Sequence, residues 1–255
     1  MRQAAQGRTP QPAGESAGST TVSKSAARKA GTNLRRIARG EGHELDLETV
    51  LATIDAYRGG FISPLRAVND ELSALLEEHR IDADVSQRLK RMSTIVEKIT
   101  QRESGLDLSR MQDIGGCRAV LVTDSVKALY TLCRLVCDHW AGAVKRYSDY
   151  VETPRPSGYR AIHVIVEQDG HLVEIQLRTQ RMHQWAQIVE GLGDALGENY
   201  KQDGSSLVQD CALLLSKMYI GLDGGPRLSP EDEARLTDLL QQIRAMLAST
   251  HEEQP

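Results

Sequence analysis

The chain has 255 residues, of which 40% are hydrophobic and 26% charged, as is typical of a globular protein with one large domain or one domain with extensions. It contains no run of about 18 apolar residues, so we expect no membrane span, and we see no pattern of a secretory signal. None of the four cysteines forms a CxxC pair, and Cys133 and Cys137 lie four apart in an apolar helical pattern. This spacing predicts reduced core thiols and a cytoplasmic compartment.

The charge is unevenly distributed along the chain. Residues 1–40 hold eight Lys or Arg against one acid, Glu15, so that segment carries +7 and leaves −11 for the rest of a chain whose net charge is −4. Residues 1–26 are rich in small and polar residues and lack apolar periodicity, which predicts disorder. We therefore expect residues 1–40 to form a basic, largely disordered segment. It is either a solvated tail or an arm that binds a polyanion such as tRNA; the absence of interleaved aromatic residues favours the tail.

The first structured region is predicted near residue 47. Between residues 47 and 79 apolar residues recur at three- and four-residue steps, which indicates helix, and Gly59, Gly60 and Pro64 should divide it in two. The alternation in residues 85–89 suits a short strand. Ser93 is then expected to cap a helix that reaches about residue 102 and turns Ile95, Val96 and Ile99 inward.

The middle of the chain alternates between strand and helix patterns. Residues 117–123 predict a buried strand, and residues 125–140 a strongly amphipathic helix with Ser125 as its cap. Residues 142–152 favour neither structure. After residue 179 we expect a helix capped by Thr179, followed by two more near residues 206–222 and 230–249. The inner stripe of the first should contain Met182, Trp185, Val189, Leu192 and Leu196. This order predicts a mixed α/β fold.

A β-hairpin is predicted on both sides of Asp169-Gly170, a favoured two-residue turn. With Gln168 opposite His171, one face of the hairpin is apolar throughout, because it pairs Val166 with Val173, Val164 with Ile175, and Ile162 with Leu177. The other face pairs Ile165 with Glu174, His163 with Gln176, and Ala161 with Arg178. A slip of one residue would destroy this agreement between the strands, so the register is well specified.

The polar face of this hairpin is a candidate functional site. Glu174, Gln176 and Arg178 stand in file, with the imidazole of His163 across from them. A sheet face exposed to water is the alternative, since antiparallel sheets often have one solvated side. Asp113, just before Gly115-Gly116 and a buried strand, is placed either to bind a metal or to form a turn.

Two further features carry chemistry. Arg88, Lys90 and Lys98 surround a predicted helix start, where free N–H groups favour anions such as a polyphosphate, although a basic surface helix would look the same. The bent loop "PRPSGY" ends on Tyr159, which is suited either to stacking on a base or to packing.

Taken together and in this order, four segments resemble the synthetase domain of the RelA/SpoT family, the enzymes that make guanosine tetra- and pentaphosphate alarmones. The segments are Arg88-Leu-Lys90 with Lys98, Asp113-Ile-Gly-Gly-Cys-Arg118, Pro154-Arg-Pro-Ser-Gly-Tyr-Arg-Ala-Ile-His163, and Glu174-Ile-Gln-Leu-Arg-Thr179. The third departs from the family pattern, which has lysine, asparagine and serine where this chain has Arg155, Ser157 and Ala161. These departures leave the carboxylates of Asp113 and Glu174 and the ring of Tyr159 in place.

The resemblance implies a fold, a reaction and a set of roles. The fold would be a nucleotidyltransferase-like mixed sheet flanked by helices, spanning residues 41–202. The reaction would move pyrophosphate from ATP to the 3′-hydroxyl of GDP or GTP and release AMP. Asp113 and Glu174 would hold Mg²⁺, with Glu174 also assisting deprotonation. Arg88, Lys90, Lys98 and Arg118 would bind ATP, and Tyr159, His163, Arg155, Gln176 and Arg178 would bind the acceptor.

Two other functions stay open. A toxic relative in the same family attaches pyrophosphate to the 3′ end of tRNA, and the basic N-terminal segment is compatible with an RNA acceptor. A catalytically inactive nucleotide- or RNA-binding module is the third reading, although it would not need two metal-binding carboxylates. The helices expected in residues 203–255 either pack on the domain or mediate assembly with a second copy or an antitoxin.

Overall fold

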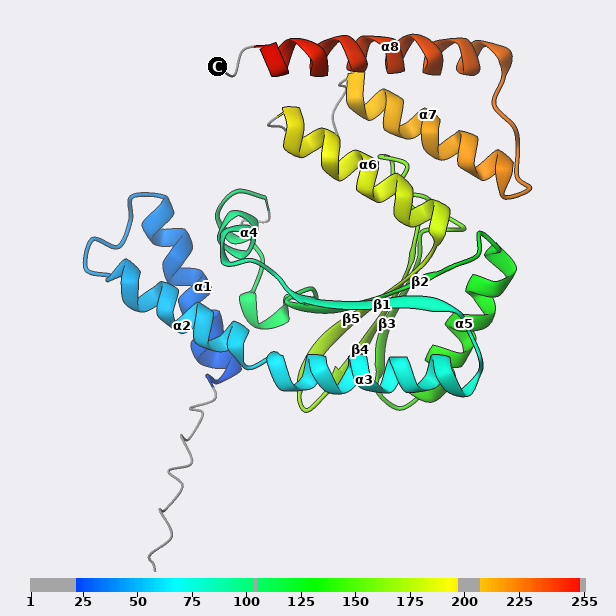
Figure 1. The fold of residues 1–255 in the computed structure, drawn as a ribbon. Helices are drawn as coiled ribbons and strands as arrows, with labels where there is room; N and C mark the ends of the chain where they lie inside the picture. Colours follow the sequence, from blue (N-terminus) through cyan, green and yellow to red (C-terminus); the bar gives the residue numbers. More distant parts are fainter. Residues whose placement is uncertain (1–21, 103–104, 197–206, 253–255) are drawn as a thin grey trace, which may run out of the picture.

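The computed structural model describes residues 22–102, 105–196 and 207–252, and its centre is a five-stranded mixed sheet (Figure 1). The strands are β1 (Ala83–Leu89), β2 (Gly115–Leu121), β3 (Val144–Asp149), β4 (Ile162–Gln168) and β5 (His171–Thr179). Their order across the sheet is β1-β2-β5-β4-β3. Only the β2–β5 pair is parallel, and the other three pairs are antiparallel.

One face of the sheet is apolar and covered by two helices, α3 (Ile62–Glu78) and α5 (Val126–His139), which lie together on the same side (Figure 1). Their buried residues form the largest core cluster with the inward side chains of β2, β4 and β5. Ser125 accepts a hydrogen bond from the backbone N–H of Ala128, so the predicted cap of α5 is confirmed. The opposite face of the sheet carries the polar side chains.

The hairpin has the predicted register. Val166 pairs with Val173, Val164 with Ile175, and His163 with Gln176. At the tip, Asp169 and Gly170 both have positive φ (49° and 75°), as the two central residues of a type I′ turn require. The agreement of the two apolar strand faces was therefore sufficient to fix this register from the sequence.

The N-terminal region is more ordered than the sequence predicts. Lys24–Ala38 forms helix α1, which packs on α2 (Leu47–Gly59), so the expectation of a largely disordered segment over residues 1–40 is wrong for these residues. The buried face of α1 consists of Ala27, Ala30, Gly31 and Leu34, which are mostly too small to give a visible apolar stripe. Residues 1–21, for which disorder was also predicted, lie outside the described residues.

Helix α1 also supports the polypeptide that leads to the polar face. Arg28 pairs with Asp107 at 2.7 Å, and Arg35 donates to the carbonyl of Leu106 at 2.6 Å. A Cβ on Gly31 would lie 3.1 Å from the Cβ of Leu108, so the helix backbone closely approaches this segment. Residues 24–38 thus belong structurally with the sheet domain, and at least two of their cations have intramolecular partners.

Leu34→Ala should lower the free energy of unfolding by about 3 kcal/mol, because it opens a cavity where a fully packed leucine is removed. Leu34 is 4% exposed in the cluster shared by α1 and α2. Leu47→Ala is a matched control, since Leu47 is 45% exposed and its loss should cost no more than about 0.5 kcal/mol. Urea unfolding of the two variants measures the difference; equal effects would mean that α1 is not part of the cooperative core.

The segment after β1 contains one wrong prediction. The helix α4 (Met92–Glu97) continues into a π-helical turn, Lys98–Arg102, so the expected helix is present. Its N-cap is Arg91, which makes no side-chain capping hydrogen bond, whereas Ser93 was predicted to be the cap. Ile95 and Ile99 are buried as expected, and Val96 is partly buried.

Three helices follow the hairpin and stack above one end of the sheet: α6 (Gln180–Leu196), α7 (Leu207–Leu222) and α8 (Pro230–Glu252) (Figure 1). The side-chain oxygen of Thr179 accepts from the backbone N–H of Met182, as predicted. Met182, Trp185 and Val189 are buried and Leu192 is partly buried, while the side chain of Leu196 lies outside the described residues. Trp185 and Val189 share a cluster with α7 and α8, so these helices pack on the domain.

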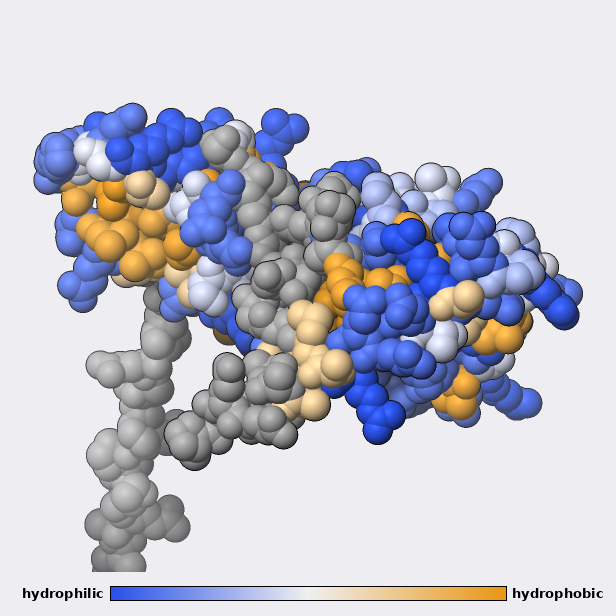
Figure 2. Space-filling view, turned by 90° about the horizontal axis from the view of Figure 1, so that it is seen from above, coloured by the Kyte–Doolittle hydropathy of each residue, from blue (hydrophilic) through white to orange (hydrophobic). Residues whose placement is uncertain are grey.

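The surface at this end of the molecule is mainly hydrophilic, with hydrophobic residues gathered in separate patches (Figure 2). Exposed large hydrophobic residues in the C-terminal helices include Leu222, Leu240 and Met246. In the described part of the chain, no helix combines the length and the hydropathy needed to cross a membrane. Cys117, Cys133 and Cys211 are buried, as predicted, and Cys137 is partly buried.

Candidate active site

The polar face of the sheet brings residues from all five strands into rows. The register places Arg88, Gly116, Glu174, Ile165 and Arg146 in one row across the sheet. The neighbouring row contains Ser86, Arg118, Gln176, His163 and Ser148. A pocket of about 760 Å³ lies over these rows, bounded also by residues 105–113 and by one side of α6. The hairpin face is therefore the floor of a pocket and not an exposed sheet surface.

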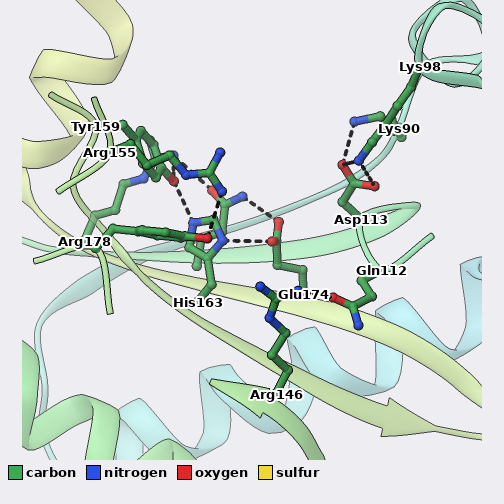
Figure 3. Close-up of polar contacts among 12 residues, drawn as sticks. Lys90, Lys98, Gln112, Asp113, Arg146, Arg155, Tyr159, His163, Glu174 and Arg178 are labelled. Carbon is green, nitrogen blue, oxygen red and sulfur yellow. Dashed lines mark hydrogen bonds and ion pairs between the residues drawn. The ribbon is translucent and has the colours of Figure 1, made fainter. Parts of the chain in front are cut away.

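Five side chains on this floor form a closed ring of hydrogen bonds (Figure 3). Arg178 donates to the hydroxyl of Tyr159 at 2.9 Å and to the amide oxygen of Gln176 at 3.0 Å. The Tyr159 hydroxyl lies 2.7 Å from Nε2 of His163, and Nδ1 of His163 lies 2.9 Å from Glu174. Gln176 completes the ring by donating to Glu174 at 2.7 Å.

Donors and acceptors can be assigned consistently to all five hydrogen bonds of the ring. If the neutral His163 carries its proton on Nδ1, it donates to Glu174 and accepts from the Tyr159 hydroxyl, which itself accepts from Arg178. Both branches then start at the guanidinium of Arg178 and end at the Glu174 carboxylate, one on each oxygen. Glu174 is thereby held in one orientation, with a carboxylate that receives two hydrogen bonds.

Glu174 is an ionised carboxylate in spite of its burial. Burial raises its pKa, but the hydrogen bonds of His163 and Gln176 act against burial, and the pKa lies below the usual 4.5. The charge of Asp113 acts in the opposite direction on Glu174. The two carboxylates are therefore close enough to influence each other electrostatically.

Asp113 is held by two lysines at the opposite side of the pocket (Figure 3). Lys90 approaches it at 2.8 Å and Lys98 at 3.2 Å, and these come from the end of β1 and from the π-helical turn. Burial raises the pKa of Asp113, but the charges and hydrogen bonds of Lys90 and then Lys98 bring it below the usual 3.8. The family resemblance implies separate roles for them, metal for Asp113 and ATP for the lysines, and the structure places the three side chains in contact.

The two carboxylates suit Mg²⁺ through their donor chemistry. Both are ionised oxygen donors that line one pocket. Within the described residues, no group of three or more His, Cys, Asp or Glu side chains could hold a metal by itself. Such a site would need further oxygen ligands from phosphates or water, which is how Mg²⁺ is commonly bound in phosphate-transferring proteins.

The pocket is rich in cations. More basic than acidic side chains line it. The basic ones are Arg88, Lys98, Arg110, Arg118, Arg146, Arg155 and Arg178, and the acidic ones are Asp107, Asp113, Glu174 and Glu190. Burial lowers the pKa of Arg118, and the charges of Arg178 and Arg88 lower it further. The Nε atom of Arg118 is buried without a hydrogen-bond partner. An anion between these guanidinium groups would relieve their repulsion, so this part of the pocket is suited to a phosphate chain.

Arg155, predicted to contact the acceptor, lies over two aromatic rings. Its guanidinium carbon is 4.4 Å from the ring centre of Tyr150 and 5.6 Å from that of Tyr159, and it donates to the Tyr150 hydroxyl at 2.9 Å. Arg178 is 5.2 Å from the same Tyr159 ring. A base that stacks on Tyr159 would therefore have to replace one of these guanidinium groups or stack beside it.

The sequence analysis missed several residues of the pocket. Arg146, Ser148 and Tyr150 come from β3 and the residue after it, in a stretch for which neither strand nor helix was predicted. Arg146 approaches the amide oxygen of Gln112 at 3.5 Å, beside Glu174 (Figure 3). The three pocket residues alternate with Lys145, Tyr147 and Asp149, so both faces of the segment carry polar groups and the sequence gives no strand signal there.

The lowered pKa values predict how the pocket responds to acid. A carboxylate whose pKa is lower when folded stabilises the fold fully above its usual pKa, and this contribution is lost as the pH falls through the lowered value. For Asp113 and Glu174 the loss should thus begin below the usual values of 3.8 and 4.5. The test is to measure the free energy of unfolding as a function of pH. Below about pH 4.5, this free energy should fall less steeply in Glu174→Gln than in the wild type. Parallel curves would contradict this assignment.

Known proteins are similar to the central part of this chain. Residues 87–204 match the family model described as the region found in RelA/SpoT proteins. GTP pyrophosphokinase rsh of Brucella melitensis is 30% identical over 143 residues, which cover 56% of this chain and 18% of that relative. GTP pyrophosphokinase of Haemophilus influenzae is 32% identical over 133 residues, covering 52% and 17%. This chain therefore spans less than a fifth of the length of these relatives.

Solved structures share the fold over most of their length. The small alarmone synthetase 1 of Bacillus subtilis has a TM-score of 0.53 and 25% identity, covering 72% of this chain and 97% of that one. A second structure of that synthetase, bound to its product pppGpp, has a TM-score of 0.51 and 26% identity, covering 65% and 92%. The small alarmone synthetase 2 of the same organism, at 22% identity and a TM-score of 0.54, shares the fold. Over residues 87–204, this chain is therefore similar to the region found in RelA/SpoT proteins.

Proposed function

We propose that this protein transfers a pyrophosphate group from ATP to the 3′-hydroxyl of GDP or GTP and releases AMP. The observation that supports it best is the pair of ionised carboxylates, Asp113 and Glu174, in one pocket lined by seven Arg and Lys side chains. Phosphoryl-type transfer depends on positioning and on charge stabilisation of phosphate oxygens, and this pocket supplies both. The related synthetase 1 of Bacillus subtilis, whose product pppGpp is a guanosine polyphosphate, supports a guanosine acceptor.

The transfer is one displacement at phosphorus. The 3′-oxygen of the acceptor bonds to the β-phosphorus of ATP, the bond from that phosphorus to the α,β-bridging oxygen breaks, and AMP leaves with the electron pair. The hydroxyl proton goes to Glu174, whose orientation is held by His163 and Gln176. Mg²⁺, held by Asp113 and Glu174 together with phosphate oxygens, would neutralise charge on the transferred group.

The cations divide naturally between the two nucleotides. We assign to ATP the cations of β1, β2 and the π-helical turn, with the lysine that directly follows β1; these are Arg88, Arg118, Lys98 and Lys90. We assign to the acceptor the pocket residues of the hairpin and of the loop before it, which are Tyr159, His163, Arg155, Gln176 and Arg178. Lys90 and Lys98 would then exchange part of their contact with Asp113 for contact with phosphate when ATP and metal bind.

The acceptor can be identified by a transfer assay. The protein is incubated with ATP labelled at the γ-phosphate and Mg²⁺, and is offered GDP, GTP or deacylated tRNA. We expect label in the guanosine nucleotides. Label in tRNA would favour the toxic relative that blocks translation, and no transfer to any acceptor would favour an inactive binding module. Since Arg28, Arg35 and Arg36 of the basic segment have partners within the chain, tRNA is the less favoured acceptor.

A further inference from the structure

The loop that carries Tyr159 lies directly against helix α7. Gly158 has a φ of +88°, and a Cβ built on it would lie 2.8 Å from the Cβ of Ser216 and 3.2 Å from the Cα of Leu213. No side chain fits in that space, and only glycine adopts this φ without strain. The backbone just before Tyr159 is thus in immediate contact with the helix backbone.

Hydrogen bonds join the same two segments. Ser216 is buried, and its hydroxyl donates to the carbonyl of Gly158 at 2.6 Å. One turn earlier on α7, the carbonyl of Ala212 accepts from the indole N–H of Trp185 at 2.7 Å. Trp185 belongs to α6 and its ring centre lies 6.2 Å from that of Tyr159. Tyr159 is therefore connected to α7 in two ways, through the neighbouring ring of Trp185 and through Gly158.

The residue after Tyr159 is held from the same helix. Arg160 donates to Asp223, the residue that follows α7, at 2.7 Å, and their side chains are 7% and 4% exposed. Asp223 also pairs with Arg181, which pairs in turn with Asp124 at 2.9 Å. Ion pairs this deeply buried are costly to disrupt, because removing one partner leaves the other charge without compensation. Both neighbours of Tyr159 in the sequence are consequently fixed by contacts with α7 and its end.

We propose that α7 positions Tyr159 for the acceptor, with Ser216 and Asp223 as positioning residues. This inference rests on the proposed function, because it concerns the acceptor side of that site. Neither residue lines the main pocket, so each acts through the loop and not by touching substrate. The ATP-side residues Arg88, Lys90 and Lys98 belong to other elements. Loss of either contact should thus weaken use of the acceptor while leaving ATP binding nearly unchanged.

The test compares three variants of α7 and its end in the full-length protein. Asp223→Asn removes the negative charge that pairs with Arg160, and Ser216→Ala removes the hydroxyl that donates to Gly158. Asp210→Asn is the control, since Asp210 is on the same helix and makes an exposed pair with Arg235 at 2.6 Å. Thermal unfolding is recorded first, and assays are run well below the lowest midpoint. The KM for GDP and the KM for ATP are then measured separately for each variant.

We expect Asp223→Asn to raise the KM for GDP roughly tenfold, with a smaller rise for Ser216→Ala, because small misplacements of a binding group have large effects. The KM for ATP should stay within about twofold in both, and Asp210→Asn should resemble the wild type. Equal rises of both KM values in Asp223→Asn, or no difference from Asp210→Asn, would contradict the proposal.

A second measurement does not depend on turnover. The chain has two tryptophans, so Trp140→Phe leaves Trp185 as the only one beside the loop. In this background, Asp223→Asn should make Trp185 fluorescence more accessible to acrylamide, and Asp210→Asn should not. Unchanged quenching in Asp223→Asn would contradict the positioning contact itself. A wild-type protein that transfers pyrophosphate to no acceptor would instead contradict the proposed function.

Discussion

Glu174→Gln is expected to reduce pyrophosphate transfer about a thousandfold, because it removes the group that we propose takes the hydroxyl proton and one of the two carboxylates that we propose hold the metal. The substitution is isosteric, and its amide can still accept from His163 or Gln176 through its remaining oxygen. The fold should thus be retained. Transfer of γ-label from ATP to GDP measures the rate, and the unfolding midpoint reports on the fold.

Glu167→Gln is a matched control for this experiment. Glu167 is on the same hairpin but outside the pocket, where it pairs with Lys145 at 2.7 Å near the surface. Its substitution changes charge by the same amount and should leave the rate near that of the wild type. If Glu174→Gln retained wild-type activity, the assignment of the hairpin face as the catalytic floor would be wrong.

Asp113→Asn should reduce transfer by about a hundredfold and increase the Mg²⁺ concentration needed for half-maximal rate. The amide removes one charged oxygen from the metal and leaves the ammonium groups of Lys90 and Lys98 without the carboxylate that they share. These lysines would then compete with the metal for phosphate oxygens. Rates measured over a range of Mg²⁺ concentrations separate this effect from a simple loss of active protein.

Asp55→Asn provides the comparison for Asp113. Asp55 makes an exposed pair with Arg58 at 3.1 Å, so its substitution should alter neither the maximal rate nor the response to Mg²⁺. A variant Asp113→Asn with a lower rate but an unchanged Mg²⁺ response would mean that Asp113 arranges the lysines and does not bind metal.

The parts of the fold that could be predicted are those in which two independent patterns agree. The hairpin is the main example, because the apolar residues of β4 and β5 and the Asp169-Gly170 turn specify one register. That register alone places His163 beside Gln176 and fixes the order of Glu174 and Arg178 on one face. The contact of Lys90 and Lys98 with Asp113, in contrast, depends on tertiary structure and was not predicted from the sequence.

The parts that were missed have weak local signals. Helix α1 buries Ala27, Ala30 and Gly31, whose small side chains form no hydrophobic stripe, so its stability comes from packing against α2 and Leu108. Strand β3 lies at an edge of the sheet and has an irregular register near Arg146, and it contains mainly polar residues. Its pairing with β4 decides its structure, and no short sequence window reports that pairing.

The closed ring of hydrogen bonds on the pocket floor links Tyr159, which we propose binds the acceptor, through His163 to Glu174, which we propose takes the proton. Removing the Tyr159 hydroxyl, as in Tyr159→Phe, leaves His163 without one partner and thereby alters the group that fixes Glu174. The effects of substitutions at Tyr159, His163 and Glu174 should therefore not be additive. Under the proposed roles, a substitution at Tyr159 that alters the choice of acceptor should also alter the hydrogen bonding of Glu174.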